Sequence, residues 1–265
     1  MRVEMNSMYS EITEDKVAVL YFNRPPLNLF TLEVFDEFDR MFTMLEECVT
    51  KDEVRSVVLT TALEKAFSAG DDVKGGPQNS DEAIRENEIA RAVMMKINNF
   101  SAPMVSAIEG YAMGGGMVLA MMADYVICSE CSKFGFGEIN FGMPCNWGST
   151  FLMASYYPLP QVKHLLISGE RFDAQTALQL NFVQKVVPSE TLLDEALTLA
   201  RLYASKAPIA ARAVKQLCNA AASGINEGGH LALENFLTRL TFDSEDVAEG
   251  TAAFSEKRDP VWRNR

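Results

Sequence analysis

Short apolar runs typical of strands alternate with helical segments up to about residue 188, and this alternation limits the possible folds more than any other feature. Apolar and β-branched residues predict strands over 16–22, 54–60, 104–108 and 125–128. Apolar residues at three- and four-residue spacing predict a helix after Thr31, and another helix is expected from Ser80, with acids in its first turn. This alternation favours an α/β core in which both faces of the sheet are covered.

From Ser189 the strand signals stop, and helical segments are expected over 189–205, 208–222, 227–242 and 244–257. The sequence has no repeat and no linker. We therefore predict one domain, with an α/β core at 1–188 and a helical extension of that domain at 189–265. The apolar faces of these helices exceed the needs of one core, which favours an oligomerisation element or a lid.

The charge balance restricts the class of partner. Asp and Glu number 36 against 24 Lys and Arg, so the formal net charge is −12. Nucleic acid and anionic membrane surfaces are not expected as main partners, because both require a basic patch. No apolar run approaches the roughly 18 residues of a membrane span, and the N-terminal residues carry no secretion signal. By elimination, a cytoplasmic protein is expected.

Cysteine and histidine give little sign of a metal or of nucleophilic catalysis. The five cysteines are odd in number and lie in apolar segments, which predicts reduced, buried thiols. Cys128 and Cys131 form a single CxxC without a second pair, for which packing is the better interpretation. His164 and His230 lie in helical stretches away from the glycine-rich segments. No Ser-His-Asp or Cys-His arrangement and no metal site is therefore expected.

Two glycine-bearing segments, 65–74 and 110–116, each follow a predicted strand directly. Strand ends of this kind form the usual ligand edge of an open α/β sheet. A helix that starts near Gly115 presents free backbone N–H groups, and a loop N–H near Asp71 can supply a second donor to form an oxyanion hole. On spacing alone, glycines that merely permit tight turns are the simpler explanation.

Several segments together resemble the enoyl-CoA hydratase/isomerase (crotonase) superfamily: AFSAGDDVK, GYAMGGGMVLAMMAD, FGFGEINFG and the terminal AFSEKRDP. NRPPLN and SGERFDAQTALQLNFVQKVVP extend the resemblance to nearly the whole chain. The resemblance implies a crotonase-like spiral of ββα turns with a C-terminal helical trimerisation region, assembled as a homotrimer or hexamer. It also implies an acyl-CoA thioester substrate, with coenzyme A as part of that substrate and no tightly bound cofactor.

Matched to the family motifs, the backbone N–H groups of Asp71 and Gly115 are implied to hold the thioester oxygen. Asp71 departs from the pattern, since the family usually has a small or apolar residue there. A carboxylate beside a developing enolate is unfavourable unless it points away. The other residues implied to bind substrate or CoA are Ala69, Gly70, Asp72, Val73, Lys74, Gly114, Trp147, Phe254, Lys257 and Arg258. Phe254 packs either on the adenine or in a helix interface, and Trp147 either shapes the acyl pocket or belongs to the core.

The carboxylates of the motif indicate the reaction. Glu138 matches one of the two glutamates of the family's hydratases, whereas Val118 stands at the position of the other. Asn146 stands where some relatives carry an Asp and can form hydrogen bonds without acting as an acid or base. A single base suffices for a 1,3-proton shift, so the resemblance favours a Δ3-Δ2 enoyl-CoA isomerase.

Two alternatives remain open. One is a hydratase or lyase of the same superfamily, acting for example on a cyclic or aromatic acyl group, with Asn146 orienting water. The other is a non-catalytic acyl-CoA-binding assembly protein.

Overall fold

A seven-stranded sheet forms the body of the molecule in the computed structural model, which describes residues 2–265. Its strand order is β1-β2-β3-β4-β6-β8-β11, antiparallel from β1 to β3 and parallel from β3 onward. The strands are β1 (Arg2–Glu4), β2 (Met8–Ile12), β3 (Val17–Phe22), β4 (Ser56–Thr61), β6 (Met104–Ile108), β8 (Tyr125–Ser129) and β11 (Lys185–Val187).

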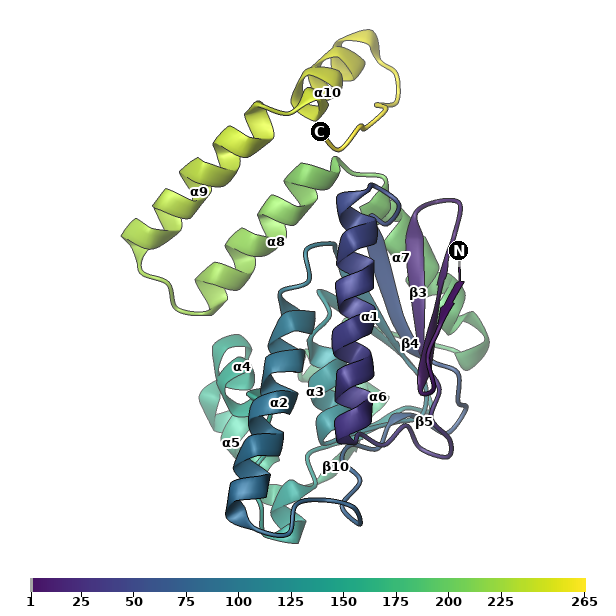
Figure 1. Cartoon of the computed structure of the whole chain (residues 1–265), viewed down its shortest axis with the longest axis vertical. Coiled ribbons are helices and arrows are strands. Elements are labelled where there is room, and N and C mark those ends of the chain that lie inside the picture. The colour runs from purple at the N-terminus through teal and green to yellow at the C-terminus, as the bar shows by residue number, and fades with distance from the viewer. Residues whose placement is uncertain (1) are drawn as a thin grey trace.

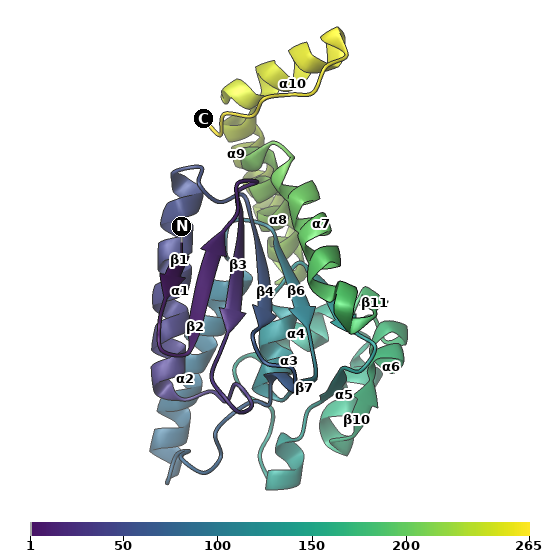
Figure 2. The same cartoon turned by 90° about the vertical axis from the view of Figure 1, so that its right-hand side faces the viewer.

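Helices cover both faces of this sheet, as Figures 1 and 2 show. One core contains the phenylalanines of α1 (Leu32–Thr50) and the inward residues of α2 (Ser80–Asn98). The second core lies under α7 (Leu192–Ala204), which packs on β3, β4, β6 and β8 through alanines. The α/β prediction is confirmed, and the strands at 104–108 and around 16–22, 54–60 and 125–128 occur as expected.

A second sheet lies below the first, with four short strands in the order β10-β9-β7-β5. Its strands are β5 (Ala66–Ser68), β7 (Tyr111–Met113), β9 (Lys133–Gly135) and β10 (Arg171–Asp173). The connecting helices are α3 (Gly115–Met121), the 3-10 turn η1 (Glu138–Phe141), α4 (Ser149–Tyr156), α5 (Leu159–Ser168), α6 (Ala174–Gln179) and the 3-10 turn η2 (Ser189–Thr191). The strands β5, β7 and β9 run parallel, so their carboxyl ends lie at one edge.

The last three helices extend away from the body (Figure 1). They are α8 (Pro208–Ala222), α9 (Glu227–Phe242) and α10 (Glu245–Glu256), close to the ranges expected from the sequence. The projecting part begins only at α8, because α7 buries its apolar face on the sheet of its own chain. The α9 helix instead exposes Leu231, Phe236 and Leu240.

Candidate active site

Three loops meet at the carboxyl edge of the four-stranded sheet. Ala66 of β5 pairs with Tyr111 of β7, so the loops after these strands, which begin near Gly70 and Gly114, lie side by side. Strand β9 pairs with the other side of β7, and Glu138 follows three residues after its end. The Gly114 N–H donates to the carbonyl of Gly135 at 2.9 Å and ties the second loop to the third.

Glycine is required where the first two loops touch. Gly70 has φ +88°, and a Cβ added to it would lie 2.9 Å from the Met113 carbonyl oxygen and 3.3 Å from the Gly115 nitrogen. Gly115 is the first residue of α3, so its N–H has no acceptor within the helix. Within residues 2–265, neither this N–H nor that of Asp71 donates a hydrogen bond to another protein group. Both remain available for one ligand oxygen, as an oxyanion hole requires.

A buried asparagine holds the Asp71 loop in place. The Asn28 side-chain amide donates to the Phe67 carbonyl at 2.9 Å, and the backbone carbonyl of Asn28 accepts from the Ser68 hydroxyl at 2.7 Å. The same hydroxyl accepts from the Gly70 N–H at 3.1 Å. Asn28 lies in the NRPPLN segment, but the sequence alone did not assign it this role.

Glu138 is half-buried at the start of η1, with its carboxylate against Gly114. A Cβ on Gly114 would lie 2.7 Å from Glu138 Oε1, so only glycine leaves room for the carboxylate. The other oxygen, Oε2, accepts a hydrogen bond from the Cys145 thiol, with an Sγ–O distance of 3.2 Å. Sequence analysis did not single out Cys145.

Val118 is buried in the core and adds no carboxylate to the site. Two other acidic residues, Asp71 and Glu86, nevertheless affect the charge of the site. Asp71 is exposed, yet partial desolvation of its carboxyl raises the pKa to about 7, aided by the negative charges of Glu86, Glu138 and Asp72. Burial also raises the pKa of Glu86, which lies on α2.

Sequence analysis did not identify Glu86, although a signal was present. The inward face of α2 carries Ala90, Val93 and Ile97, and Glu86 lies one turn before Ala90 on the same stripe.

Trp147 belongs mainly to the core. It is 5% exposed, and its ring makes edge contacts with Phe30 and Phe35 at centroid distances of 5.1 and 5.0 Å. The ring also lies over Gly115, where an added Cβ would come within 1.8 Å of it. Trp147 therefore packs against the start of α3 at Gly115. Asn146 is exposed and forms no side-chain hydrogen bond within residues 2–265.

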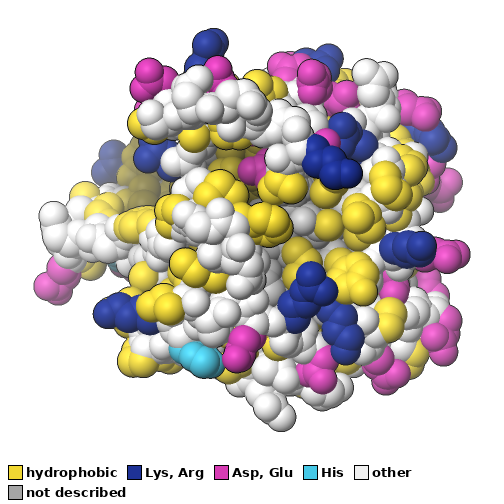
Figure 3. Space-filling model, turned by 90° about the horizontal axis from the view of Figure 1, so that it is seen from below, with side chains coloured by type: hydrophobic (Ala, Val, Ile, Leu, Met, Phe, Trp, Pro, Cys, Tyr) yellow, Lys and Arg dark blue, Asp and Glu magenta, His cyan; other side chains and the backbone are white. Residues whose placement is uncertain are grey.

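The surface around the site mixes apolar and basic groups. Figure 3 views the molecule from the end that carries the four-stranded sheet and shows hydrophobic side chains gathered in the middle, with basic side chains beside them. Lys74 and Val73 are exposed directly after Asp71, and Phe141 and Met143 are exposed after Glu138. An anionic ligand with an apolar arm fits this combination.

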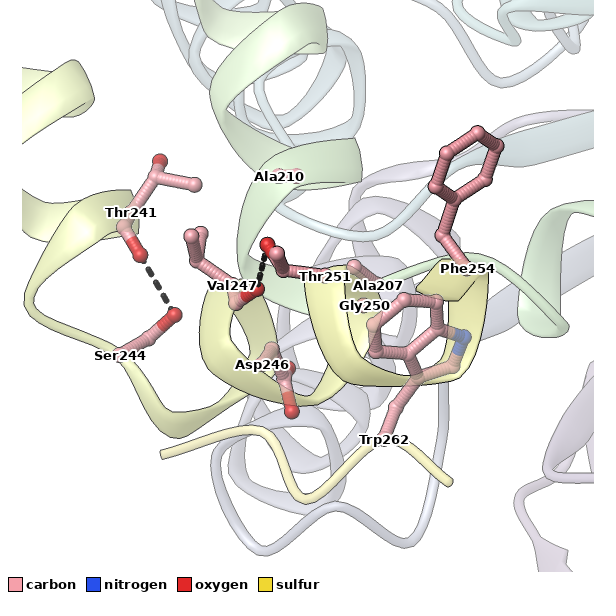
Figure 4. Close-up of a pocket in the computed structure, with 10 residues that line it drawn as sticks. All are labelled: Ala207, Ala210, Thr241, Ser244, Asp246, Val247, Gly250, Thr251, Phe254 and Trp262. Atoms are coloured by element: carbon pink, nitrogen blue, oxygen red, sulfur yellow. Dashed lines mark hydrogen bonds between the residues drawn. The ribbon is translucent and has the colours of Figure 1, made fainter. Parts of the chain in front are cut away.

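The structure does not bring Phe254, Lys257 and Arg258 to Glu138 within one chain. They lie on or just after α10, at the opposite end of the molecule (Figures 1 and 2). Phe254 is 86% exposed at the edge of a recess of ≈ 420 Å³ between α8 and α10, near Trp262 (Figure 4). Arg258, just after α10, pairs with two glutamates of that helix.

The described residues contain no group of three or more side chains placed to hold a metal ion. No helix among residues 2–265 has both the length and the apolar character needed to cross a bilayer. The expectation of buried thiols is wrong for Cys131 and Cys218, which are exposed. Cys131 donates to Glu109 at 2.8 Å, which a polar surface loop allows.

Comparisons with known proteins agree with the fold and the motifs. The family model for enoyl-CoA hydratase/isomerase matches residues 12–265. Carnitinyl-CoA dehydratase of Citrobacter koseri is 32% identical over 254 residues, which cover 94% of this chain and 95% of the relative. An enoyl-CoA hydratase structure from Bacillus anthracis superposes with a TM-score of 0.91 at 28% identity, covering 98% of this chain and 100% of that chain. One from Polaromonas sp. JS666 superposes with a TM-score of 0.87 at 27% identity, covering 97% and 99%. The chain belongs to the enoyl-CoA hydratase/isomerase (crotonase) superfamily.

Proposed function

We propose that this enzyme moves the double bond of a 3-enoyl-CoA to C2, with Glu138 as its single base. One observation carries the proposal: the Glu138 carboxylate lies against Gly114, the residue before the free N–H of Gly115, and Gly70 brings the Asp71 loop against the same segment. Buried Val118 supports a single-base reaction, because α3 supplies no second carboxylate.

In the proposed reaction, the thioester oxygen accepts hydrogen bonds from the Asp71 and Gly115 N–H groups. Glu138 removes a proton from C2, and the electron pair delocalises over C2, C4 and the thioester. The protonated Glu138 then returns the proton to C4, which leaves the double bond between C2 and C3. The cycle consumes nothing and needs no tightly bound cofactor, since coenzyme A arrives as part of the substrate.

The N–H pair is expected to supply much of the rate. Negative charge develops on the thioester oxygen only as the enolate forms, so donors fixed in advance favour that state over the ground state. Removing one such donor typically lowers the rate by about 10²–10³-fold. Gly70 and Trp147 fix the two loops from opposite sides, which keeps these donors in position.

A specific observation favours hydration or dehydration as the second candidate. Asp71 has a pKa of about 7, so a large fraction of its carboxyl groups is protonated at neutral pH. A protonated carboxyl beside Glu138 is the second proton-transfer group that syn-hydration needs. The relatives named carnitinyl-CoA dehydratase and enoyl-CoA hydratase point in the same direction.

A substrate panel separates these functions. Purified protein is offered 3-enoyl-CoA, 2-enoyl-CoA, a saturated acyl-CoA and a cyclic or aromatic acyl-CoA, and products are separated chromatographically. Isomerisation without hydration supports the proposal, whereas hydration of 2-enoyl-CoA without isomerisation favours the second candidate. Tight binding of the saturated ester without turnover of any substrate would contradict both and leave an acyl-CoA-binding protein. Glu138→Gln provides the control for background reaction.

A further inference from the structure

We propose that Cys145 is a positioning residue for the base. Its thiol holds one oxygen of the Glu138 carboxylate so that the other, Oε1, faces the loop at Gly114. This inference rests on the proposed role of Glu138.

The two oxygens of Glu138 have different surroundings. Oε1 lies 2.7 Å from the Cβ position of Gly114, whereas Oε2 lies 3.7 Å from that position and accepts from Cys145 Sγ at 3.2 Å. The terminal torsion of a glutamate is broad and has no strong preference of its own. The hydrogen bond from Cys145 therefore restricts the rotation of the carboxylate plane and keeps the other oxygen against Gly114.

Cys145 is suited to this contact because it is 9% exposed. Burial raises the pKa of the thiol, and the neighbouring Glu138 charge and the hydrogen bond raise it further. The thiol thus stays protonated across the neutral range and keeps its donor.

A thiol is a weak donor compared with a hydroxyl. Hydrogen bonds to a carboxylate stabilise its charged form, and a stronger donor makes it a weaker base. A thiol thus orients Glu138 through a weaker hydrogen bond than a hydroxyl would form. Serine at this position would orient the carboxylate but weaken the base, and alanine would remove the orientation.

Acids surround Glu138 in the structure, and exposed Lys74 lies farther along the Asp71 loop. Asp71, on the loop after β5, interacts with Glu138, and Asp72 and Glu86 of α2 act in turn on Asp71. A change at Cys145 leaves these three groups in place, so a change in pH dependence can be assigned to the thiol.

The test compares Cys145→Ser and Cys145→Ala with Cys48→Ala as a matched control. Cys48 is also a buried thiol, but it lies on α1 and its thiol does not contact Glu138. The pH profile of kcat/KM for the accepted enoyl-CoA is measured, together with an NMR titration of the ¹³C-labelled Glu138 carboxyl.

We expect Cys145→Ser to move the acid limb and the NMR midpoint to lower pH by roughly half a unit or more, since one unit corresponds to the worth of one strong hydrogen bond to a charge. Cys145→Ala should move both to higher pH and lower kcat roughly 3–10-fold with KM nearly unchanged, a loss typical of one weak hydrogen bond. Cys48→Ala should change neither the midpoints nor kcat.

Midpoints that stay the same in Cys145→Ser, or that move equally in Cys48→Ala, would overturn the inference. If Cys145→Ala fails to fold, the serine variant alone carries the test. The NMR titration also separates the two proposals. If Cys145→Ser moves the midpoint but Glu138→Gln keeps full turnover, Glu138 is not the base, although its contact with Cys145 is supported. If Cys145→Ser leaves the midpoint unchanged and Glu138→Gln is inactive, only the role of Cys145 is contradicted.

Discussion

Replacing Asp71 by Asn should stabilise the free protein at neutral and alkaline pH. The folded protein raises the pKa of this carboxyl from its ordinary 3.8 to about 7, mainly by desolvation and then by the charges of Glu86 and Glu138. Below about pH 4 the carboxyl is protonated in both folded and unfolded chains. Between pH 4 and 7 the folded chain retains a proton that the unfolded chain releases, so stability falls as pH rises through this window.

The size of the effect follows from the same pKa values. Each unit of pKa difference corresponds to about 1.4 kcal/mol, so a fully enclosed carboxyl would cost roughly 4 kcal/mol. Asp71 is exposed, and water screens its repulsion from neighbouring acids. We therefore expect Asp71→Asn to add roughly 1–2 kcal/mol above pH 7, or about 2–4 °C of Tm for each kcal/mol.

The assay is thermal and urea denaturation at about pH 5 and pH 8, in low salt and at one protein concentration. Asp259→Asn is the control, because this acid is exposed and its side chain forms no ion pair within residues 2–265. The stability gain from Asp71→Asn should be larger at pH 8 than at pH 5. An equal gain at both pH values, or a loss at pH 8, would refute the argument that this carboxyl is desolvated and repelled.

Three further predictions concern catalysis and assembly. Glu138→Gln should lower turnover by roughly 10²–10⁴-fold with little change in acyl-CoA affinity; equal solvent exchange at C2 of an acyl-CoA in wild type and variant would show that Glu138 is not the base. Val118→Glu should add hydration of 2-enoyl-CoA by restoring a second carboxylate, and a folded variant without any hydration would contradict the carboxylate argument. Light scattering at micromolar concentration should give a trimer or hexamer, because α9 exposes Leu231, Phe236 and Leu240; a monomer mass would exclude this.

Long periodic segments were predictable from the sequence, and three-residue strands were not. The helix expected over 208–222 matches α8, because four helical turns repeat the 3.6-residue pattern often enough to be recognised. The strands β5, β7 and β9 are too short for any period to show. β2 was missed because its buried face includes Ser10 as well as Met8, so polar and apolar residues do not alternate cleanly.

Contacts between segments that are distant in the sequence limited how much of the site could be predicted. The resemblance to the family motifs implied Asp71, Gly115 and Glu138, and the structure brings their loops together. No local pattern relates Cys145 to Glu138 or Glu86 to Asp71, because each pair meets only through tertiary packing. The family motif located the proposed donors and the proposed base, while the effect of Glu86 on Asp71 comes from the packing of α2 near the loop.

Asp71 also makes the reaction sensitive to pH. The enolate places negative charge on an oxygen held by the Asp71 N–H, and a charged carboxyl on the same residue opposes that charge. Because the pKa of the carboxyl is about 7, neutral and charged forms coexist near neutral pH.

Enolate formation should be faster in the neutral form, so kcat/KM should fall as pH rises through about 7. Asp71→Asn has no charge on this side chain at any pH and should abolish this fall. If the alkaline fall persists unchanged in Asp71→Asn, the carboxyl does not oppose the enolate and its charge points away from the reacting oxygen. If the variant instead loses activity at every pH while still binding acyl-CoA, the carboxyl takes part in proton transfer, and hydration replaces isomerisation as the better proposal.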